Sequence, residues 1–166
     1  MANRIGIISD THLTGCSDRF TRLVDSTFRD CSIIIHAGDI TDMSVLDAFS
    51  GKTLFAVHGN MCSRPVRNRF PESQSISIDG YSIAVCHGAG LWGSIEEQLY
   101  DRFFDADCIV YGHTHQPANH YIGRILFINP GSFASTGRYG NPGSYAILET
   151  SENELTATIH SLPQPK

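Results

Sequence analysis

The stretch Ile5-Gly6-Ile7-Ile8-Ser9-Asp10-Thr11-His12 decides how the rest of the chain is interpreted. Its apolar beginning predicts a short buried strand, and an aspartate and a histidine follow where that strand ends. The arrangement returns twice, because Gly38-Asp39 follows an apolar segment at 32–36 and Gly59-Asn60 follows another at 53–57. Polar residues after successive strands are typical of the ligand-binding edge of an open α/β sheet.

Helices are expected between these strands. Residues 17–30 carry apolar side chains at helical spacing. Thr41 is suited to cap a short helix that precedes the third strand. Strands over 4–9, 32–36 and 53–57 that alternate with helices predict a parallel sheet with helices packed on one of its faces.

The second half of the chain has a different pattern. Residues 76–78 and 81–85 alternate between apolar and polar, and Asp79-Gly80 between them suits a tight hairpin turn. Ser94 and Glu97 form a capping box at the start of a helix over 94–104. Further strands are expected at 108–111, 124–128, 145–148 and 155–159. The prediction is about nine strands and three helices in one domain, residues 1–166.

Composition restricts the class of protein. The chain has 166 residues with 41% apolar and 17% charged residues, which is globular, and a net charge of −5 without runs of lysine or arginine. A nucleic-acid surface is therefore not expected. Five cysteines without a CxxC pair argue against a disulfide framework and a zinc ribbon, so the thiols are expected to be reduced. Since no signal peptide or membrane span is seen, a cytoplasmic protein is expected.

Two histidine motifs complete the set of polar strand ends. His87-Gly88 follows the predicted hairpin, and Gly112-His113-Thr114-His115 follows the strand at 108–111. His87-Gly88 alone means little, whereas the two imidazoles of Gly-His-Thr-His, two residues apart in an extended segment, can reach adjacent sites. Together with the three earlier strand ends, they predict one site made of imidazole, carboxylate and amide groups.

The order D-x-H, G-D, G-N, H-G and G-H-x-H resembles the calcineurin-like metallophosphoesterase superfamily. The small size and the segment Asn129-Pro130-Gly131-Ser132 resemble its compact bacterial and archaeal phosphodiesterase branch. The resemblance implies an α/β fold of two mixed β-sheets packed as a sandwich with flanking helices, in four layers. It also implies two divalent metal ions. The first would be bound by Asp10, His12 and His115, the second by Asn60, His87 and His113, and Asp39 would bridge both.

The implied chemistry is hydrolysis of a small phosphodiester. Two metal ions would generate a bridging hydroxide near neutral pH and orient the phosphate for in-line attack, without a covalent enzyme intermediate. Asp39, Asn60 and His87 are the predicted catalytic residues, since they hold the metals and, through the second ion, the substrate. Mixed nitrogen and oxygen ligands suit first-row metals, with Mn expected first and Ni, Co, Fe or Zn as alternatives.

The sequence departs from the family pattern beside two motifs. Relatives often carry a histidine or cysteine and then an acidic residue after G-N, where this chain has Met61 and Cys62, and Ala89 replaces a histidine after H-G. The leaving-group acid is therefore open. Cys62 can donate weakly, and His58 is either a replacement acid or a structural histidine. A preference for esters with acidic leaving groups is expected.

Other residues have two interpretations each. His36 either supports the site or is an ordinary buried histidine, and Trp92 either walls a cleft or packs. Arginines that follow Asn60 are either ligands of a second phosphate or part of a solvated loop. The same alternatives apply to a glycine-rich loop over 135–143. The arginines after Asn60 are Arg64, Arg67 and Arg69, and the loop residues are Arg138 and Tyr139.

Three rival functions share this fold or chemistry. The retromer scaffold subunit has the fold and has lost part of the metal site, so a catalytically weak or inactive binding protein is the main alternative. A nuclease would need a basic track, and a phosphoserine phosphatase would need a leaving-group acid. Formation of a homo-oligomer is left open by the sequence.

Overall fold

The computed structural model describes residues 3–133 and 142–163. Within these residues, ten strands form two mixed sheets of five strands each. The first sheet has the order β10-β9-β1-β2-β3, and the second has the order β4-β5-β6-β8-β7. The strands are β1 (Asn3–Ile8), β2 (Ile33–His36), β3 (Thr53–Ala56), β4 (Ser73–Ile78), β5 (Tyr81–Cys86), β6 (Cys108–Val110), β7 (Ala118–Ile122), β8 (Ile125–Asn129), β9 (Ser144–Thr150) and β10 (Leu155–Ser161).

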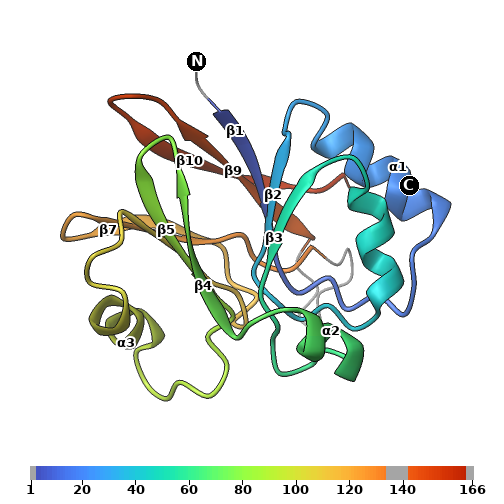
Figure 1. Ribbon diagram of the computed structural model, residues 1–166, viewed down its shortest axis with the longest axis horizontal. Helices are drawn as coiled ribbons and strands as arrows, with labels where there is room; N and C mark the ends of the chain where they lie inside the picture. Colours follow the sequence, from blue (N-terminus) through green and yellow to red (C-terminus); the bar gives the residue numbers. More distant parts are fainter. Residues whose placement is uncertain (1–2, 134–141, 164–166) are drawn as a thin grey trace.

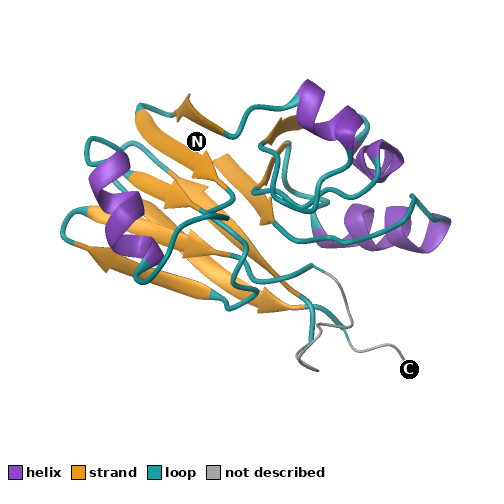
Figure 2. Ribbon diagram, turned by 90° about the horizontal axis from the view of Figure 1, so that it is seen from below, coloured by secondary structure: helices purple, strands orange, loops and turns teal. Residues whose placement is uncertain are grey.

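The two sheets pack face to face, and helices cover their outer faces (Figures 1 and 2). The α-helix α1 (Asp18–Thr27) and the 3-10 helix η1 (Met43–Phe49) lie against the first sheet. The helix α3 (Ile95–Arg102) lies against the second sheet, and the short helix α2 (Arg64–Arg69) follows β3. The predicted four-layer α/β sandwich is confirmed.

The parallel centre of the first sheet was predicted from the apolar segments. Strand β1 pairs in parallel with β2, and β2 pairs in parallel with β3, with Ile7 opposite Ile35 and Ile35 opposite Phe55. Because parallel strands end at the same edge, the residues after β1, β2 and β3 come together there. Gly6 of β1 permits close packing on α1, since a Cβ at this position would lie 2.5 Å from the Phe28 ring.

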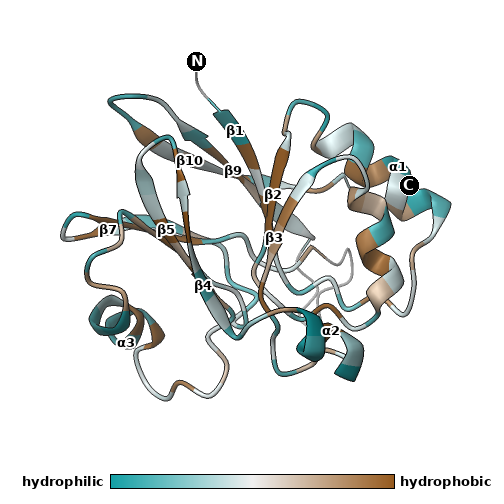
Figure 3. Ribbon diagram, viewed as in Figure 1, coloured by the Kyte–Doolittle hydropathy of each residue, from teal (hydrophilic) through white to brown (hydrophobic). Residues whose placement is uncertain are grey.

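The core between the sheets is made by alternate residues of the strands. Ile5 and Ile7 of β1 meet Ile83 and Val85 of β5 in one buried cluster, which is fully shielded from solvent at these four positions. Figure 3 shows hydrophobic segments, in brown, along the strands of both sheets. Burial of each such side chain contributes roughly 1.5–3 kcal/mol to the free energy of folding. This packing holds the two sheets together.

The predicted turn at Asp79-Gly80 and the predicted cap at Ser94 are confirmed. Asp79 and Gly80 take φ values of 52° and 86°, as a tight hairpin turn between β4 and β5 requires. The Ser94 hydroxyl accepts a hydrogen bond from the Glu97 amide at 3.4 Å and caps α3. The five cysteines are all free thiols. Among the described residues, no helix has the length and hydrophobicity needed to cross a membrane.

Three local predictions were wrong. Strand β7 (Ala118–Ile122) was not predicted, because its polar sequence Ala-Asn-His-Tyr-Ile is largely exposed at a sheet edge. The arginines after Asn60 form the helix α2 rather than a loop. The helix expected after Thr41 is a 3-10 helix capped by Asp42, whose carboxylate accepts from the Ser44 amide at 2.8 Å.

Candidate metal centre

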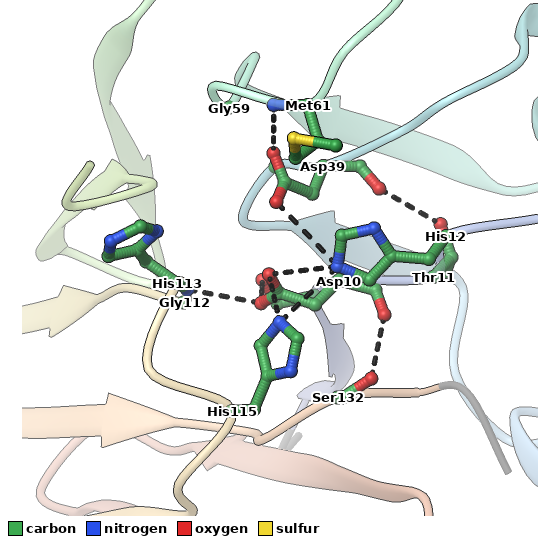
Figure 4. Close-up of polar contacts among 12 residues, drawn as sticks. Asp10, Thr11, His12, Asp39, Gly59, Met61, Gly112, His113, His115 and Ser132 are labelled. Atoms are coloured by element: carbon green, nitrogen blue, oxygen red, sulfur yellow. Dashed lines mark hydrogen bonds and ion pairs between the residues drawn. The ribbon is translucent and has the colours of Figure 1, made fainter. Parts of the chain in front are cut away.

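Asp10 is the centre of a cluster of carboxylates and imidazoles at one edge of the sandwich (Figure 4). Its side chain is fully buried, and its Oδ1 atom lies 3.1 Å from His115 Nε2 and 3.6 Å from His12 Nε2. These two imidazole nitrogens are 3.3 Å apart. One atom from each of Asp10, His12 and His115 therefore fits around a single ion, although the residues come from loops after β1 and β6.

A second group of potential ligands shares Asp10 with the first. The Asp39 carboxylate, after β2, places Oδ2 at 3.2 Å from His87 Nε2 and 3.7 Å from His12 Nε2. His87 Nε2 is also 3.8 Å from Asp10 Oδ1. Asp10, Asp39 and His87 thus converge within the span of one coordination sphere. Asp39 lies between a histidine of the first group and a histidine of the second.

His113 and Asn60 border the second group. The rings of His113 and His87 lie edge to face with centroids 5.2 Å apart. The His113 amide donates to Asp10 Oδ2 at 3.1 Å. Asn60 is exposed and lines a cavity together with His87. The structure therefore brings six of the seven predicted ligands into direct contact with one another and places Asn60 on the adjoining wall.

The backbone of the ligand loops adopts an uncommon conformation. Six non-glycine residues within the described ranges have positive φ, and five of them are predicted ligands: Asp10 (54°), His12 (45°), Asp39 (58°), His113 (68°) and His115 (58°). Such conformations cost of order 1–3 kcal/mol each and persist where the surrounding structure enforces them. They concentrate at functional sites, and here they aim the side chains at one point.

Glycines beside the ligands allow the loops to approach. A Cβ at Gly59 would lie 2.2 Å from Asp39 Oδ1, and a Cβ at Gly38 would lie 2.6 Å from His87 Nδ1. At Gly112 it would lie 2.8 Å from Asp10 Oδ2. The glycines of the G-D, G-N and G-H motifs therefore leave room for the ligand side chains.

Backbone carbonyls and buried polar side chains support the ligands. His87 Nδ1 donates to the Ala37 carbonyl at 2.8 Å, which fixes the ring and leaves Nε2 as the nitrogen that faces the carboxylates. The fully buried His36 accepts from the Gly38 amide at 3.2 Å through Nδ1 and contacts the Thr11 hydroxyl through Nε2. His36 therefore supports the loops after β1 and β2 rather than binding an ion.

The segment Asn129-Pro130-Gly131-Ser132 braces the two ligand loops of the first group. Asn129 Nδ2 donates to the Gly112 carbonyl at 3.0 Å and to the Thr114 hydroxyl at 2.9 Å. Ser132 Oγ donates to the Asp10 carbonyl at 2.8 Å. The resemblance pointed to this segment by its sequence alone, and the structure supplies its physical role.

The electrostatics of the cluster favour cations. Burial raises the pKa of Asp10, but hydrogen bonds from His115 and His12 and the charge of His87 outweigh it and hold this pKa far below its usual value. Burial lowers the pKa of His87, yet the carboxylates of Asp39 and Asp10 raise it overall. Burial lowers the pKa of His36 to about 3, so this ring is neutral. The Asp10 carboxylate is therefore held as an anion among the imidazoles, which favours the binding of a cation.

The residues present fit divalent metal ions. His87 Nε2 is buried and has no hydrogen-bond partner among the described residues, although an unpaired buried nitrogen is costly. A metal ion would use its lone pair. The donor set of imidazole nitrogens and carboxylate oxygens suits first-row divalent metals.

A sequence model of the calcineurin-like phosphoesterase superfamily domain matches residues 4–153. The chain belongs to this superfamily. It is a hydrolase of the metallophosphoesterase type, and its Asp and His cluster contains two groups of side chains that could each hold a metal ion.

Relatives of this phosphoesterase include archaeal proteins. It is 31% identical over 158 residues to a probable metallophosphoesterase of Methanothermobacter thermautotrophicus, covering 93% of this chain and 90% of the relative. It is similar to the solved structure of an archaeal phosphodiesterase, with 25% identity, a TM-score of 0.72, and coverage of 95% and 99% of the two chains. A vacuolar protein sorting 29 structure from Cryptosporidium parvum has a TM-score of 0.81 at 20% identity, over 99% and 94% of the chains. This last likeness shows the fold alone.

The phosphoesterase differs from the expected pattern in the loop after Asn60. Cys62 Sγ is buried and accepts hydrogen bonds from the Ile40 amide at 3.2 Å and the Gly59 amide at 3.1 Å. Burial raises the pKa of this thiol. Cys62 Sγ therefore joins the two ligand loops as an acceptor of two backbone amides.

The remaining residues singled out from the sequence lie around the site, on the surface or outside the described residues. The Met61 amide donates to Asp39 Oδ1 at 2.8 Å, and its side chain is exposed. His58 lines the same cavity as Asn60. Trp92 is 89% exposed, so it does not pack in the core. Arg138 and Tyr139 lie outside the described residues.

Proposed function

We propose that this phosphoesterase hydrolyses small phosphodiesters at a site for two divalent metal ions. The observation that supports the proposal most strongly is the shared carboxylate pair. Asp10 takes part in two separate groups of potential ligands, and Asp39 Oδ2 lies within 3.7 Å of a histidine from each group. When bound, two ions at such a site supply an activated hydroxide and neutralise the phosphate oxygens.

The proposed ligands would be distributed over the two ions as follows. Asp10, His12 and His115 hold the first ion, and His87, His113 and Asn60 hold the second. Asp39 bridges the two. Thr11 and His36 keep the backbone of both aspartate loops in place, because the Thr11 hydroxyl donates to the Asp39 carbonyl at 3.4 Å while it contacts His36. Mn is the expected metal, with Ni, Co, Fe and Zn as alternatives.

The substrate class follows from what surrounds the cluster. Met61 and Ala89 have no titratable side chain, and Cys62 is used as a backbone acceptor. A phosphodiester with an acidic leaving group needs no strong proton donor, so aryl diesters are the preferred substrates. The net charge of −5 disfavours long nucleic-acid substrates.

The test begins with chelator-treated protein and the return of Mn, Ni, Co, Zn or Mg. Hydrolysis of a para-nitrophenyl phosphodiester is expected only with metal, and faster than hydrolysis of a simple alkyl phosphomonoester. Asp39→Asn removes the bridging charge and should lower activity by at least roughly 100-fold. Asp25→Asn, at an exposed position on α1, is the matched control and should keep full activity.

The scaffold alternative predicts a different result. If metal binds near two ions per chain by calorimetry while neither ester is hydrolysed with any metal, the catalytic proposal is refuted and a binding protein of the same fold is favoured. Full metal-dependent activity of Asp39→Asn would refute the assignment of the bridging ligand.

A further inference from the structure

A small cavity opens directly beside the second ligand group. Its lining residues come from α2 and α3, from the segment before β4 and from the end of β5, elements that can be located in Figure 1. Asn60 and His87 form its wall on the side of the metal centre. A substrate whose phosphate sits at the carboxylate and histidine cluster therefore has one of its substituents next to this cavity.

The size of the cavity limits that substituent. Its volume is about 170 Å³. A cavity of roughly 150 Å³ is enough for a benzene molecule, whereas drug-sized ligands occupy roughly 300 Å³ or more. The space thus admits a single ring or a short carbon chain. Leu91 and Leu99 give part of the wall an apolar character suited to such a group.

The guanidinium groups of Arg67 and Arg102 line the cavity, together with one carboxylate, that of Glu72. Arg67 donates through Nε to the Cys62 carbonyl at 3.1 Å and through Nη2 to the Asn60 carbonyl. Both acceptors are neutral, so the positive charge of Arg67 persists. The same bonds hold the loop that carries Asn60, which makes Arg67 a positioning residue as well.

Arg102, at the end of α3, is the more available of the two cations. Its Nη2 atom donates to the Ser73 hydroxyl at 3.0 Å, and its Nη1 atom is 4.0 Å from Glu72. The Glu72 side chain is 73% exposed and that of Arg102 is 44% exposed, so this ion pair is long and screened. The cavity lining therefore has an excess of positive charge in a protein whose net charge is negative.

We infer that this cavity is a subsite for a compact substituent that carries a second negative charge, a carboxylate or a phosphate, and that Arg102 determines this specificity. The inference rests on the proposed phosphodiesterase function and narrows its substrate class. The natural substrate is then a small phosphoester with a charged group one ring or a few carbons away from the scissile phosphate. Guanidinium groups bind both kinds of anion through paired N–H donors.

Non-hydrolysable phosphonates test the inference by binding rather than by turnover. Manganese-loaded protein is titrated by calorimetry with propylphosphonate, phosphonopropionate and propane bisphosphonate, which differ in the second charged group. Wild-type protein should bind at least one charged phosphonate roughly tenfold more tightly than propylphosphonate, and the two charged probes separate a carboxylate from a phosphate preference.

Three variants show whether Arg102 causes the difference. Arg102→Gln should reduce the preference to about one, and Arg102→Lys should retain part of it. Arg124→Gln is the matched control, because Arg124 is also half-exposed and paired with an aspartate, Asp107, at 3.5 Å, but lies outside the cavity lining. It should leave the preference unchanged.

The opposite results separate the two proposals. If all three phosphonates bind wild-type protein equally, or if Arg102→Gln keeps the full preference because the metals hold the second anion, the subsite is refuted and the phosphodiesterase proposal stands. If no phosphonate binds in the presence of metal, the proposed function fails, and the subsite fails with it.

Discussion

Gly59 gives a direct test of how closely the ligand loops are fitted together. A Cβ at this position would lie 2.2 Å from Asp39 Oδ1 and 2.7 Å from His87 Cδ2. Ordinary van der Waals contact begins at 3.4 Å, so the Asp39 oxygen must move by roughly 1 Å in a Gly59→Ala variant. The backbone of Gly59 is not in the left-handed region, so the effect is steric.

The magnitude follows from that displacement. A misplacement of about 1 Å in a catalytic constellation costs about 100-fold in rate, which corresponds to roughly 2.7 kcal/mol of transition-state stabilisation. Overpacking of this kind lowers the free energy of unfolding by roughly 1–3 kcal/mol, so the variant should still fold. Metal affinity should fall with activity, because the displaced oxygen belongs to the proposed bridging ligand.

The assay compares wild type, Gly59→Ala and Gly15→Ala for hydrolysis of a para-nitrophenyl phosphodiester and for Mn binding by calorimetry. Gly15→Ala is the control, since its Cβ would meet only Ser44 Oγ at 3.7 Å. Circular dichroism monitors the fold of each variant. A folded Gly59→Ala protein that keeps its metal affinity and its rate within roughly threefold of wild type would refute the steric reasoning.

Three further results are expected. The pKa of His36 is about 3 when folded, below its usual value of 6.5, so the unfolded chain binds the extra proton and stability falls as pH drops from 6.5 towards 3. In urea denaturation of metal-free protein, the free energy of unfolding of His36→Gln should fall less steeply with decreasing pH than that of wild type, by up to about 1.4 kcal/mol per pH unit in that window. The same pH dependence in both proteins would contradict this. Mn at roughly 100 times its Kd should stabilise the protein by about 2.7 kcal/mol and raise Tm by roughly 5–10 °C, an increase that chelator should abolish in a thermal melt. Ile83→Ala, in the fully buried core between the sheets, should lower the free energy of unfolding by roughly 2–5 kcal/mol without changing Mn affinity of the folded protein, as denaturation and calorimetry would show.

The central part of this architecture could be predicted because local sequence and global fold agree there. Strands β1, β2 and β3 are mostly apolar, and Asp10, Asp39 and Asn60 follow their ends by two, three and four residues. Since parallel strands end at one edge, Asp10, Asp39 and Asn60 had to come near one another. The Asp79-Gly80 turn was equally determined by local chemistry, because its left-handed backbone requires such residues.

What escaped prediction depends on tertiary contacts. Strand β7 is held by its partner β8 and has no apolar pattern of its own. Arg102 appeared in the sequence as an ordinary residue near the end of a helix, and only the fold brings it to the cavity beside Asn60. The role of Cys62 as an acceptor for two backbone amides likewise depends on Ile40 and Gly59, which belong to different loops.

The first ligand group joins residues that belong to opposite halves of the sandwich. Asp10 follows β1 of the first sheet, and His115 follows β6 of the second. An ion held by both would act as a removable cross-link that closes a loop of roughly 100 residues, comparable in its effect on chain entropy to a disulfide. Loss of the ion would then weaken the contact between the two sheets as well as abolish hydrolysis. Amide hydrogen exchange would become faster in the loops that carry Asp10 and His115, while the amides within each sheet would stay protected.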